Sequence, residues 1–309
     1  MPLTREQRLA LHARARDLRK DVVNITAFSG GAHIGGGLSS MDILVLLYFH
    51  YLNIDPERPQ WEDRDRFVLS KGHGAVAYVP VLARRGFFDF EDVRTFNKFG
   101  SPFGMHPDSR RIRGCDASTG SLGHGLPMAV GMALGTRLQG KTCKTFCLLG
   151  DGECNEGVVW EALMAAAHYR LTNLVTIIDR NHLMIDGQTE DVMGIEPLAD
   201  KLAAFGFEVH AVDGHNLDAL AGAIERAIEV ADQDLKVNGG LKAQAEIRKN
   251  GHKPIAIIAD TVKGKGVDFM EGQVPWHYGA VDSGLEAKAL ASLDRYYDAI
   301  FAAEGGSNE

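Results

Sequence analysis

Several features that would define particular protein classes are scarce in this sequence. Its four cysteines among 309 residues do not fall into the paired spacings of a zinc site, and no signal peptide opens the chain. No apolar run approaches the roughly eighteen residues that a membrane-spanning helix requires. Basic residues number 33 against 41 acidic ones, and this net charge of −8 disfavours nucleic acid as a partner. We therefore expect a cytoplasmic enzyme subunit with neither a membrane nor a nucleic-acid partner.

The apolar segments that are present predict an α/β fold. Residues 145–149 and 174–178 are short and continuously apolar, as expected of strands buried on both faces of a parallel sheet. Residues 158–171 lie between them without Gly or Pro and favour a crossover helix. Further strands are expected at 67–69, 207–212 and 255–259, and helices at 4–20, 39–51, 75–84, 124–138, from 217, and at 285–303. The pattern predicts a doubly wound, mostly parallel sheet with helices on both faces.

Two polar residues follow the two apolar runs. Asp151 and Asn181 lie after the first and second run, and a right-handed strand–helix–strand unit brings both to one edge of the sheet. Gly150 and Gly152 leave the backbone amides beside the aspartate open to a phosphate. A carboxylate, an amide oxygen and a backbone carbonyl suit Mg²⁺ or Ca²⁺. Alone, an Asp-Gly pair is more often a turn. Its pairing with Asn181 favours a diphosphate and metal site.

The combination of Gly150-Asp151-Gly152 with a later Asn181 resembles the thiamine diphosphate signature. Other motifs resemble the N-terminal, diphosphate-binding half of the transketolase family, in its order and spacing. These motifs are Ser70-Lys71-Gly72-His73-Gly74, His106-Pro107, Thr119-Gly120-Ser121-Leu122-Gly123-His124-Gly125 and Val212-Asp213-Gly214-His215. The resemblance extends from Arg14 to Gly279, so it implies the thiamine diphosphate-binding fold for most of the chain. One departure is Ile34, which stands where the family usually has a proline.

The resemblance also implies roles for individual residues. It gives the metal to Asp151, Asn181 and the main-chain carbonyl of Leu183. The implied cofactor contacts are His73, Gly120, Leu122, Gly152, Asn181, Ile185 and His277. The implied catalytic residues are His33, His73, His106, His277 and Glu156. Thiamine diphosphate supplies the electron sink, and imidazoles with near-neutral pKa values would move protons at the reacting carbon and the sugar hydroxyls.

Glu156 and Glu161 match acidic positions that lie at the dimer interface in the family and connect two active sites. The alternative is that they only place negative charge at the N-terminal end of a helix. Basic runs at 110–113 and 263–265 are either solvated surface or contacts to a sugar phosphate or the cofactor. The segment 232–253 is longer than the family usually allows before the last strand. We expect a solvent-exposed helical hairpin there or a contact to another subunit.

Transketolases need a second domain whose glutamate activates the cofactor. After residue 279 only an Ala-rich helical tail remains, which is too short for a sheet domain of about 100 residues. We therefore expect a thiamine diphosphate-binding domain at 1–280, a helical tail at 281–309, and a separate partner chain. That partner, a C-terminal transketolase subunit, would supply the pyrimidine-binding domain and the activating glutamate. Two copies of each chain would form an α2β2 assembly.

The expected reaction is transfer of a two-carbon ketol unit from a ketose, phosphorylated by expectation, to an aldose. A modified sugar, branched or sulfonated, is an alternative donor. A 2-oxo acid dehydrogenase α-subunit shares the diphosphate motif but lacks Ser70-Lys71-Gly72-His73 and His106-Pro107. A deoxyxylulose phosphate synthase is about twice this length, counting its second domain. A non-enzymatic scaffold is disfavoured by the intact Asp151 and Asn181, and a nicotinamide-binding fold by the missing Gly-rich fingerprint.

Overall fold

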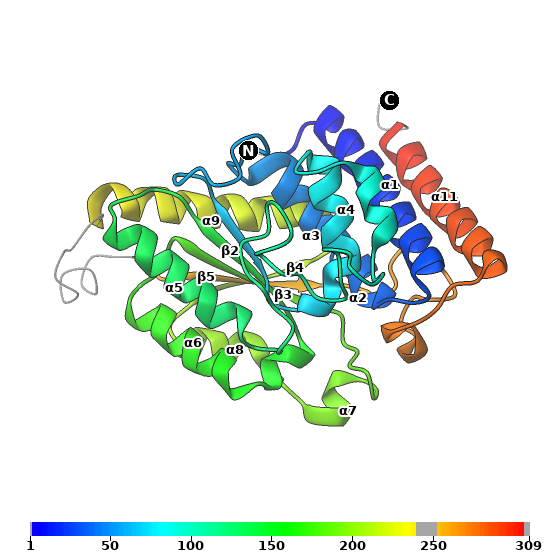
Figure 1. Cartoon of the computed structure of the whole chain (residues 1–309). Helices are drawn as coiled ribbons and strands as arrows, with labels where there is room; N and C mark the ends of the chain where they lie inside the picture. The colour runs from blue at the N-terminus through cyan, green and yellow to red at the C-terminus, as the bar shows by residue number, and fades with distance from the viewer. Residues whose placement is uncertain (1, 239–251, 306–309) are drawn as a thin grey trace.

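The computed structural model describes residues 2–238 and 252–305 and is built on one five-stranded sheet (Figure 1). The strands are β1 (Arg66–Leu69), β2 (Thr145–Gly150), β3 (Leu174–Arg180), β4 (Glu208–Asp213) and β5 (Ile255–Asp260). Their order is β1-β2-β3-β5-β4, and every neighbouring pair is parallel. The predicted parallel sheet is confirmed, with a strand at each of the five expected places.

Helices cover both faces of this sheet, as predicted. One face carries α1 (Arg5–Ser29), α3 (Met41–Leu46), α4 (Ala75–Arg85) and α9 (Leu217–Asn238); the other carries α5 (Gly125–Leu138), α6 (Gly157–His168) and α8 (Leu198–Ala204). In Figure 1, α9 lies above the sheet, and α5, α6 and α8 lie below it. Consecutive strand residues point to opposite faces, so Ile177 packs in one apolar cluster and Ile178 in the other.

The register of the central strands fixes where the polar residues emerge. β2 and β3 are buried along their whole length, and Thr145 pairs with Leu174 while Gly150 pairs with Asp179. The two strands therefore end level with one another, and Asp151 and Asn181 lie at the same edge of the sheet. This is the arrangement that the sequence predicts for a ligand site.

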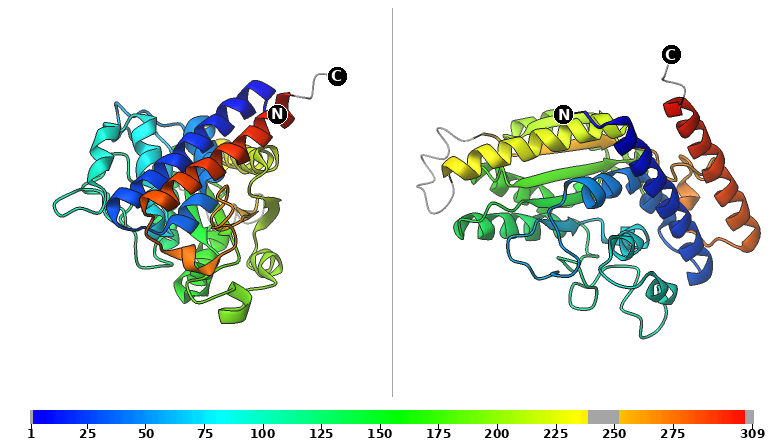
Figure 2. Two further views of the ribbon diagram at one scale, coloured as in Figure 1. Left: turned by 90° about the vertical axis from the view of Figure 1, so that its right-hand side faces the viewer. Right: turned by 90° about the horizontal axis from the view of Figure 1, so that it is seen from above.

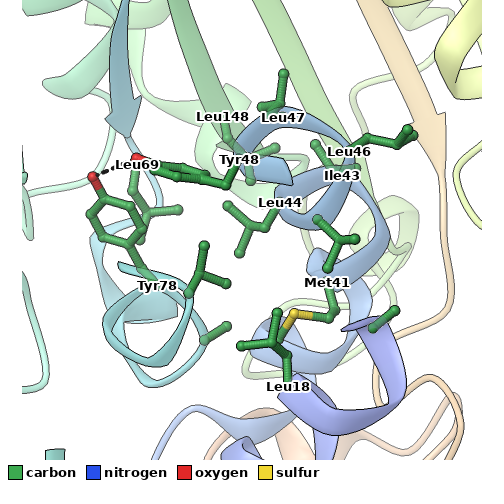
Figure 3. Close-up of a cluster of buried hydrophobic side chains, with 14 of the residues drawn as sticks. Leu18, Met41, Ile43, Leu44, Leu46, Leu47, Tyr48, Leu69, Tyr78 and Leu148 are labelled. Atoms are coloured by element: carbon green, nitrogen blue, oxygen red, sulfur yellow. Dashed lines mark hydrogen bonds between the residues drawn. The ribbon is translucent and has the colours of Figure 1, made fainter. Parts of the chain in front are cut away.

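The helix expected at 39–51 is interrupted, and this expectation was wrong in its detail. The segment forms α2 (Ile34–Ser39), α3 and a π-helical turn at Leu47–Tyr51. The Ser40 hydroxyl donates to the carbonyl of Gly36 at 2.5 Å and competes with the backbone bonds that would continue the helix. Figure 3 shows the apolar side chains of this segment packed with Leu18 and Tyr78. The hydroxyls of Tyr48 and Tyr78 lie 3.0 Å apart.

The two ends of the described chain lie side by side. α11 (Ser283–Gly305) runs antiparallel to α1, as Figure 2 shows, with an ion pair of 2.8 Å between Arg8 and Glu304 and another between Lys20 and Asp294. α1 extends beyond the predicted 4–20 and ends where Gly30 takes a φ of 81°. No helix of the described residues is long and apolar enough to cross a membrane.

Two further expectations concern loops. Residues 97–119 contain no helix or strand, which confirms the long loop. Of the hairpin expected at 232–253, residues 232–238 continue α9, and Asp234 and Leu235 are buried rather than exposed. Residues 239–251 lie outside the described part of the chain.

Candidate active site

A cavity of about 300 Å³ opens at the edge of the sheet where the strands end. Its lining comprises His33, Gly36, Lys71, His73, His106, Gly120, Leu122, Gly150, Asp151, Gly152, Glu153, Asn181, Leu183, Met184, Ile185, Lys263 and His277. Every residue that the sequence proposes for the metal, the cofactor or proton transfer is in this set except Glu156. The fold thus brings together residues that are more than 200 positions apart in the chain.

The ends of four strands deliver most of these residues. The 3₁₀ turn Gly72–Gly74 follows β1 and carries His73, and the 3₁₀ turn Gly152–Asn155 follows β2. Asn181 and Leu183 follow β3, and Lys263 follows β5. His277 comes from a third 3₁₀ turn, Val274–His277, and a bridge between Ala32 and Gly279 holds that segment beside the loop of His33.

The Asp151 carboxylate is held by hydrogen bonds on both oxygens. Oδ1 accepts from the backbone N–H of Gly152 at 2.8 Å. Oδ2 accepts from Arg180 at 2.8 Å, from the N–H of His182 at 2.7 Å and from the hydroxyl of Thr189 at 3.1 Å. Asp151 and Arg180 are both buried, so their ion pair is shielded from solvent. The carboxylate has one orientation, fixed before any ligand binds.

The Asn181 amide is oriented in the same way. Its Nδ2 donates to Asp179 at 3.1 Å, and its Oδ1 accepts from the N–H of Leu183 at 3.3 Å. Asp179 also forms an ion pair with Lys71, and both side chains are almost wholly buried. Burial would raise the pKa of Asp179, but the Lys71 ammonium outweighs it and lowers that pKa. Since Nδ2 is bound to Asp179, Asn181 presents its oxygen to the cavity.

A cation already contacts the third predicted metal ligand. The Lys263 ammonium donates to the carbonyl of Leu183 at 2.5 Å and lies 2.9 Å from Nδ1 of His277. Burial, together with the charge of Lys71, lowers the pKa of Lys263 to about 8. The oxygens of Asp151, Asn181 and Leu183 are hard donors of the kind that Mg²⁺ and Ca²⁺ take. In the described part of the chain no group of three His, Cys, Asp or Glu side chains could hold a metal. A metal at this edge would complete its shell with oxygens from outside the chain.

Four imidazoles gather on one side of the cavity. The ring centre of His33 lies 5.1 Å from that of His73, 5.6 Å from that of His277 and 6.4 Å from that of His106. Burial lowers all four pKa values, to about 4 for His33 and about 3 for His277. The rings are therefore neutral at pH 7 and can accept protons. Nδ1 of His33 is buried without a hydrogen-bond partner among the described residues.

Glycine keeps space open beside these groups. A Cβ atom at Gly120 would lie 3.2 Å from Cγ of His106, and one at Gly152 would lie 2.9 Å from Cγ of Met184. A Cβ at Gly36 would lie 3.6 Å from the Lys71 ammonium. Side chains at these places would fill the cavity or displace its walls.

Glu156 lies outside the cavity. It is exposed at the start of α6, and it forms no capping hydrogen bond there. Its side chain instead covers Gly123, where a Cβ would lie 2.7 Å from that of Glu156. Glu161 is also exposed, on α6 itself. The dimer-interface role of both residues stays a prediction.

Sequence reasoning does not single out three charged residues of the site, Lys71, Glu153 and Lys263. Lys71 lies within a motif that the family shares, and Lys263 within a basic run that the sequence alone assigns to either surface or site. Glu153 directly follows the Gly-Asp-Gly motif and accepts from Ser70, from the N–H of Gly123 at 2.8 Å and from that of Gly150 at 3.0 Å.

The basic run at 110–113 lies outside the cavity lining. Arg110 pairs with Asp108, and Arg111 and Arg113 bind backbone carbonyls. These contacts hold the long loop to itself and to the segment of Pro56, and they support the surface interpretation of this run.

Residues 8–293 match the family described as transketolase, thiamine diphosphate binding domain. The chain belongs to the transketolase family. It is 39% identical over 290 residues to the 6-deoxy-6-sulfo-D-fructose transketolase subunit SqwG of Clostridium sp. (strain MSTE9), covering 94% of this chain and 98% of the relative. It is 38% identical over 269 residues to an apulose-4-phosphate transketolase subunit of Phocaeicola vulgatus, covering 87% of this chain and 88% of the relative.

Solved transketolases share the fold. The transketolase from Leishmania mexicana superposes with a TM-score of 0.77 at 25% identity, covering 96% of this chain and 48% of that one. For the transketolase from Campylobacter jejuni the TM-score is 0.76 at 28% identity, with 96% and 47% covered. The predicted family and fold are confirmed, and the chain spans about half the length of these solved transketolases.

Proposed function

We propose that this chain is the N-terminal, diphosphate-binding subunit of a two-chain transketolase. The observation that carries the proposal is the cavity at the strand ends, where oriented oxygen donors, two buried lysines and four neutral imidazoles meet. Lysine ammonium groups and open backbone amides suit an anionic ligand, and hard oxygens suit a divalent cation.

The residues of the cavity fit thiamine diphosphate with Mg²⁺ or Ca²⁺. Asp151, Asn181 and the carbonyl of Leu183 would hold the metal, which would take the place of the Lys263 ammonium on that carbonyl. Lys263, once released, would lie beside the diphosphate. The remaining proposed contacts are His73 and Gly152 to the diphosphate and Gly120, Leu122, Ile185 and His277 around the rings.

The histidines would handle protons. When bound, the cofactor supplies an electron sink for the two-carbon fragment. His33 and His106 are neutral at pH 7. The unprotonated nitrogen of each ring can accept the proton of a donor hydroxyl, and its N–H can donate a hydrogen bond to a developing alkoxide. His33 keeps one nitrogen, the buried Nδ1, without a hydrogen-bond partner among the described residues.

A partner chain would complete the site. The relatives that this chain covers at 88% and 98% are themselves called subunits, whereas the solved transketolases are about twice as long. Ile185 lines the cavity and yet is 60% exposed, which suits a surface that a second chain covers. That chain would bring the pyrimidine-binding domain and the activating glutamate.

We further propose that two copies of each chain assemble, with Glu156 and Glu161 at the interface between the copies. Residues 1–280 would form the cofactor domain and residues 281–309 the tail, whose described helix α11 lies along α1. A cavity of about 670 Å³ is lined by residues of α5 and the loop before it and includes Pro127 and Met128. Gly123 of that loop lies beside Glu156.

The substrate would be a ketose whose far end is anionic. The two relatives act, by their names, on 6-deoxy-6-sulfo-D-fructose and on apulose 4-phosphate. We therefore propose a modified sugar, sulfonated or branched, as the donor candidate to test beside the ordinary ketose phosphates.

The experiment is ketol transfer with thiamine diphosphate and Mg²⁺, by this chain alone and with the product of the neighbouring reading frame. The donors are xylulose 5-phosphate, 6-deoxy-6-sulfofructose and apulose 4-phosphate. Activity only in the mixture supports the proposal, and the preferred donor identifies the substrate class. Full activity of the single chain would contradict the two-chain proposal.

The Asp151→Ala variant tests the metal assignment directly. We expect loss of metal-dependent cofactor binding by calorimetry, because a carboxylate ligand and the partner of buried Arg180 both disappear. Asp298→Ala, an exposed position on α11, is the matched control and should bind as the unmodified chain does. Unchanged binding by Asp151→Ala would remove the metal site from the proposal.

A further inference from the structure

The motif Val212-Asp213-Gly214-His215 contributes nothing to the cavity lining, yet it ends in a buried histidine. The His215 side chain is only 10% exposed and lies between α3 and the segment that follows β5. Its Nδ1 is 2.7 Å from Oδ2 of Asp42, and its Nε2 is 2.9 Å from the backbone nitrogen of Val262. The imidazole thus bridges α3 to the segment that carries Lys263.

The bridge fixes the tautomer of His215. A backbone N–H can only donate, so Nε2 must accept from Val262 and carries no proton. Nδ1 then carries the proton and donates to the Asp42 carboxylate. A side chain that could serve only one of these partners would leave either Val262 N–H without an acceptor or Asp42 without one of its donors.

Asp42 is itself anchored from the opposite side. Arg19 donates to both of its oxygens, at 3.0 and 2.8 Å, and both side chains are buried. Burial would raise the pKa of Asp42, but Arg19 and the hydrogen bond from His215 outweigh it and hold the pKa well below its usual range. Arg19 also binds the carbonyl of Leu38 at 3.0 Å and the hydroxyl of Tyr297 on α11. The series of contacts therefore starts from a buried ion pair, Arg19 with Asp42, that is held in place on both sides.

The other end of the chain of contacts leads into the cavity. Val262 directly precedes Lys263, whose ammonium contacts the carbonyl of Leu183. Two more backbone bonds flank this point, from Thr261 N–H to the carbonyl of Arg180 and from Gly264 N–H to that of Gly35, each of 3.0 Å. Among the described residues, His215 is the one side chain that binds the backbone of Val262.

We propose that His215 is a positioning residue for Lys263. The contacts run from Arg19 to Asp42, then to His215 and to the backbone N–H of Val262. The buried Arg19–Asp42 pair thereby fixes the position of the backbone from which Lys263 reaches the cavity. This inference rests on the proposed function in one respect, because the consequence for a ligand assumes that Lys263 lies beside the diphosphate.

Two substitutions separate the two halves of the bridge. The amide of His215→Asn can replace Nδ1 at Asp42 but does not reach Val262. The amide of His215→Gln can place its oxygen near Nε2 and accept from Val262, but it loses Asp42. His210→Gln is the matched control, since His210 lies on β4 and its side chain forms a hydrogen bond with the nearby Glu208.

The first measurement is amide hydrogen exchange at Val262 in the full chain without ligand. We expect faster exchange in His215→Asn and near-normal protection in His215→Gln and His210→Gln. The second is calorimetric affinity for thiamine diphosphate with Mg²⁺, which we expect to fall about tenfold in His215→Asn and to change little in the other two. The third is the melting temperature of every variant.

The three measurements together decide whether His215 positions Lys263. If His215 serves stability alone, affinity will follow the melting temperature, and His215→Gln, which strips Asp42 of a partner, will bind as poorly as His215→Asn. Equal exchange at Val262 in the two variants would also overturn the positioning role. If the unmodified chain fails to bind the cofactor, with or without its partner chain, the proposed function fails, and the exchange at Val262 still decides the role of His215.

Discussion

At the scale of single residues, burial and pairing control the chemistry of the site. Lys71 pairs with Asp179 and Asp151 with Arg180, while the four imidazoles of the cavity form no ion pair with a carboxylate of the described residues and stay neutral. Asp151 and Asn181 could be found from the sequence, because parallel strands end at one edge. For Lys263 the sequence leaves surface and site open, and Glu153 is not found, because the contacts of both depend on segments that are distant in the sequence.

The neutral state of His33 gives a pH prediction. Its pKa in the folded chain, about 4, lies below the ordinary value near 6.5, so the unfolded chain binds more protons between these two values. This contribution makes the folded state less stable as the pH falls from about 6.5 to about 4. We expect His33→Phe to show a shallower loss of stability in that window, measured by urea unfolding at a series of pH values. A slope equal to that of the unmodified chain would contradict the lowered pKa.

Asp42 gives the opposite sign. Its pKa is held below the unfolded value of about 4, so its contribution is fully present above that pH and is lost as the pH falls toward the folded pKa. Asp42→Asn at pH 7 leaves buried Arg19 without its counter-charge and should cost roughly 3–5 kcal/mol of unfolding free energy. Arg58 and Asp55 form an exposed pair, and Asp55→Asn should change the unfolding free energy far less. Similar losses in both variants, measured by chemical denaturation, would contradict the difference in burial as the cause.

At the scale of elements, the sequence predicts where helices and strands lie better than whether a helix is continuous. Apolar runs and strand-end residues located all five strands and most helices, because burial on both faces imposes a simple pattern. The break at Ser40 escaped prediction because it depends on one hydroxyl that bonds to Gly36, a choice that periodicity does not reveal. The pattern of apolar residues also does not show where two elements approach each other closely.

The start of α5 illustrates that close approach. A Cβ atom at Gly125 would lie 2.5 Å from Cα of Ser70, at the end of β1, so backbone would have to move. We expect Gly125→Ala to lower the unfolding free energy by about 1–3 kcal/mol. Gly222→Ala on α9 meets no atom within 4 Å and should raise it by up to about 1 kcal/mol through helix propensity. Chemical denaturation of the two variants checks both signs, and stabilisation by both would refute the steric argument.

At the scale of the whole molecule, the proposed function gives the edge of the sheet and the helical faces different partners. The edge carries the cavity, which the proposed partner chain would cover. The face formed by α5 and α6 is away from the sheet and exposes apolar side chains, with Met164 60% and Leu138 49% exposed. α11 packs along α1 and covers another side of the molecule. This packing could not be predicted, because the apolar pattern of a helix does not show which other helix it packs against.

Self-association should therefore depend on the face formed by α5 and α6. A charge at Met164 would be buried against the second copy without a counter-charge, which is costly, whereas in the single chain it stays in water. We expect Met164→Glu to shift the chain toward monomer in light scattering coupled to gel filtration, with an unchanged melting temperature of the monomer. Phe28→Glu, at a 40% exposed position on α1, introduces the same charge on another surface and should leave the mass unchanged. Loss of assembly in Phe28→Glu but not in Met164→Glu would move the interface to the α1 side, and Glu156 and Glu161 would then no longer lie between two copies.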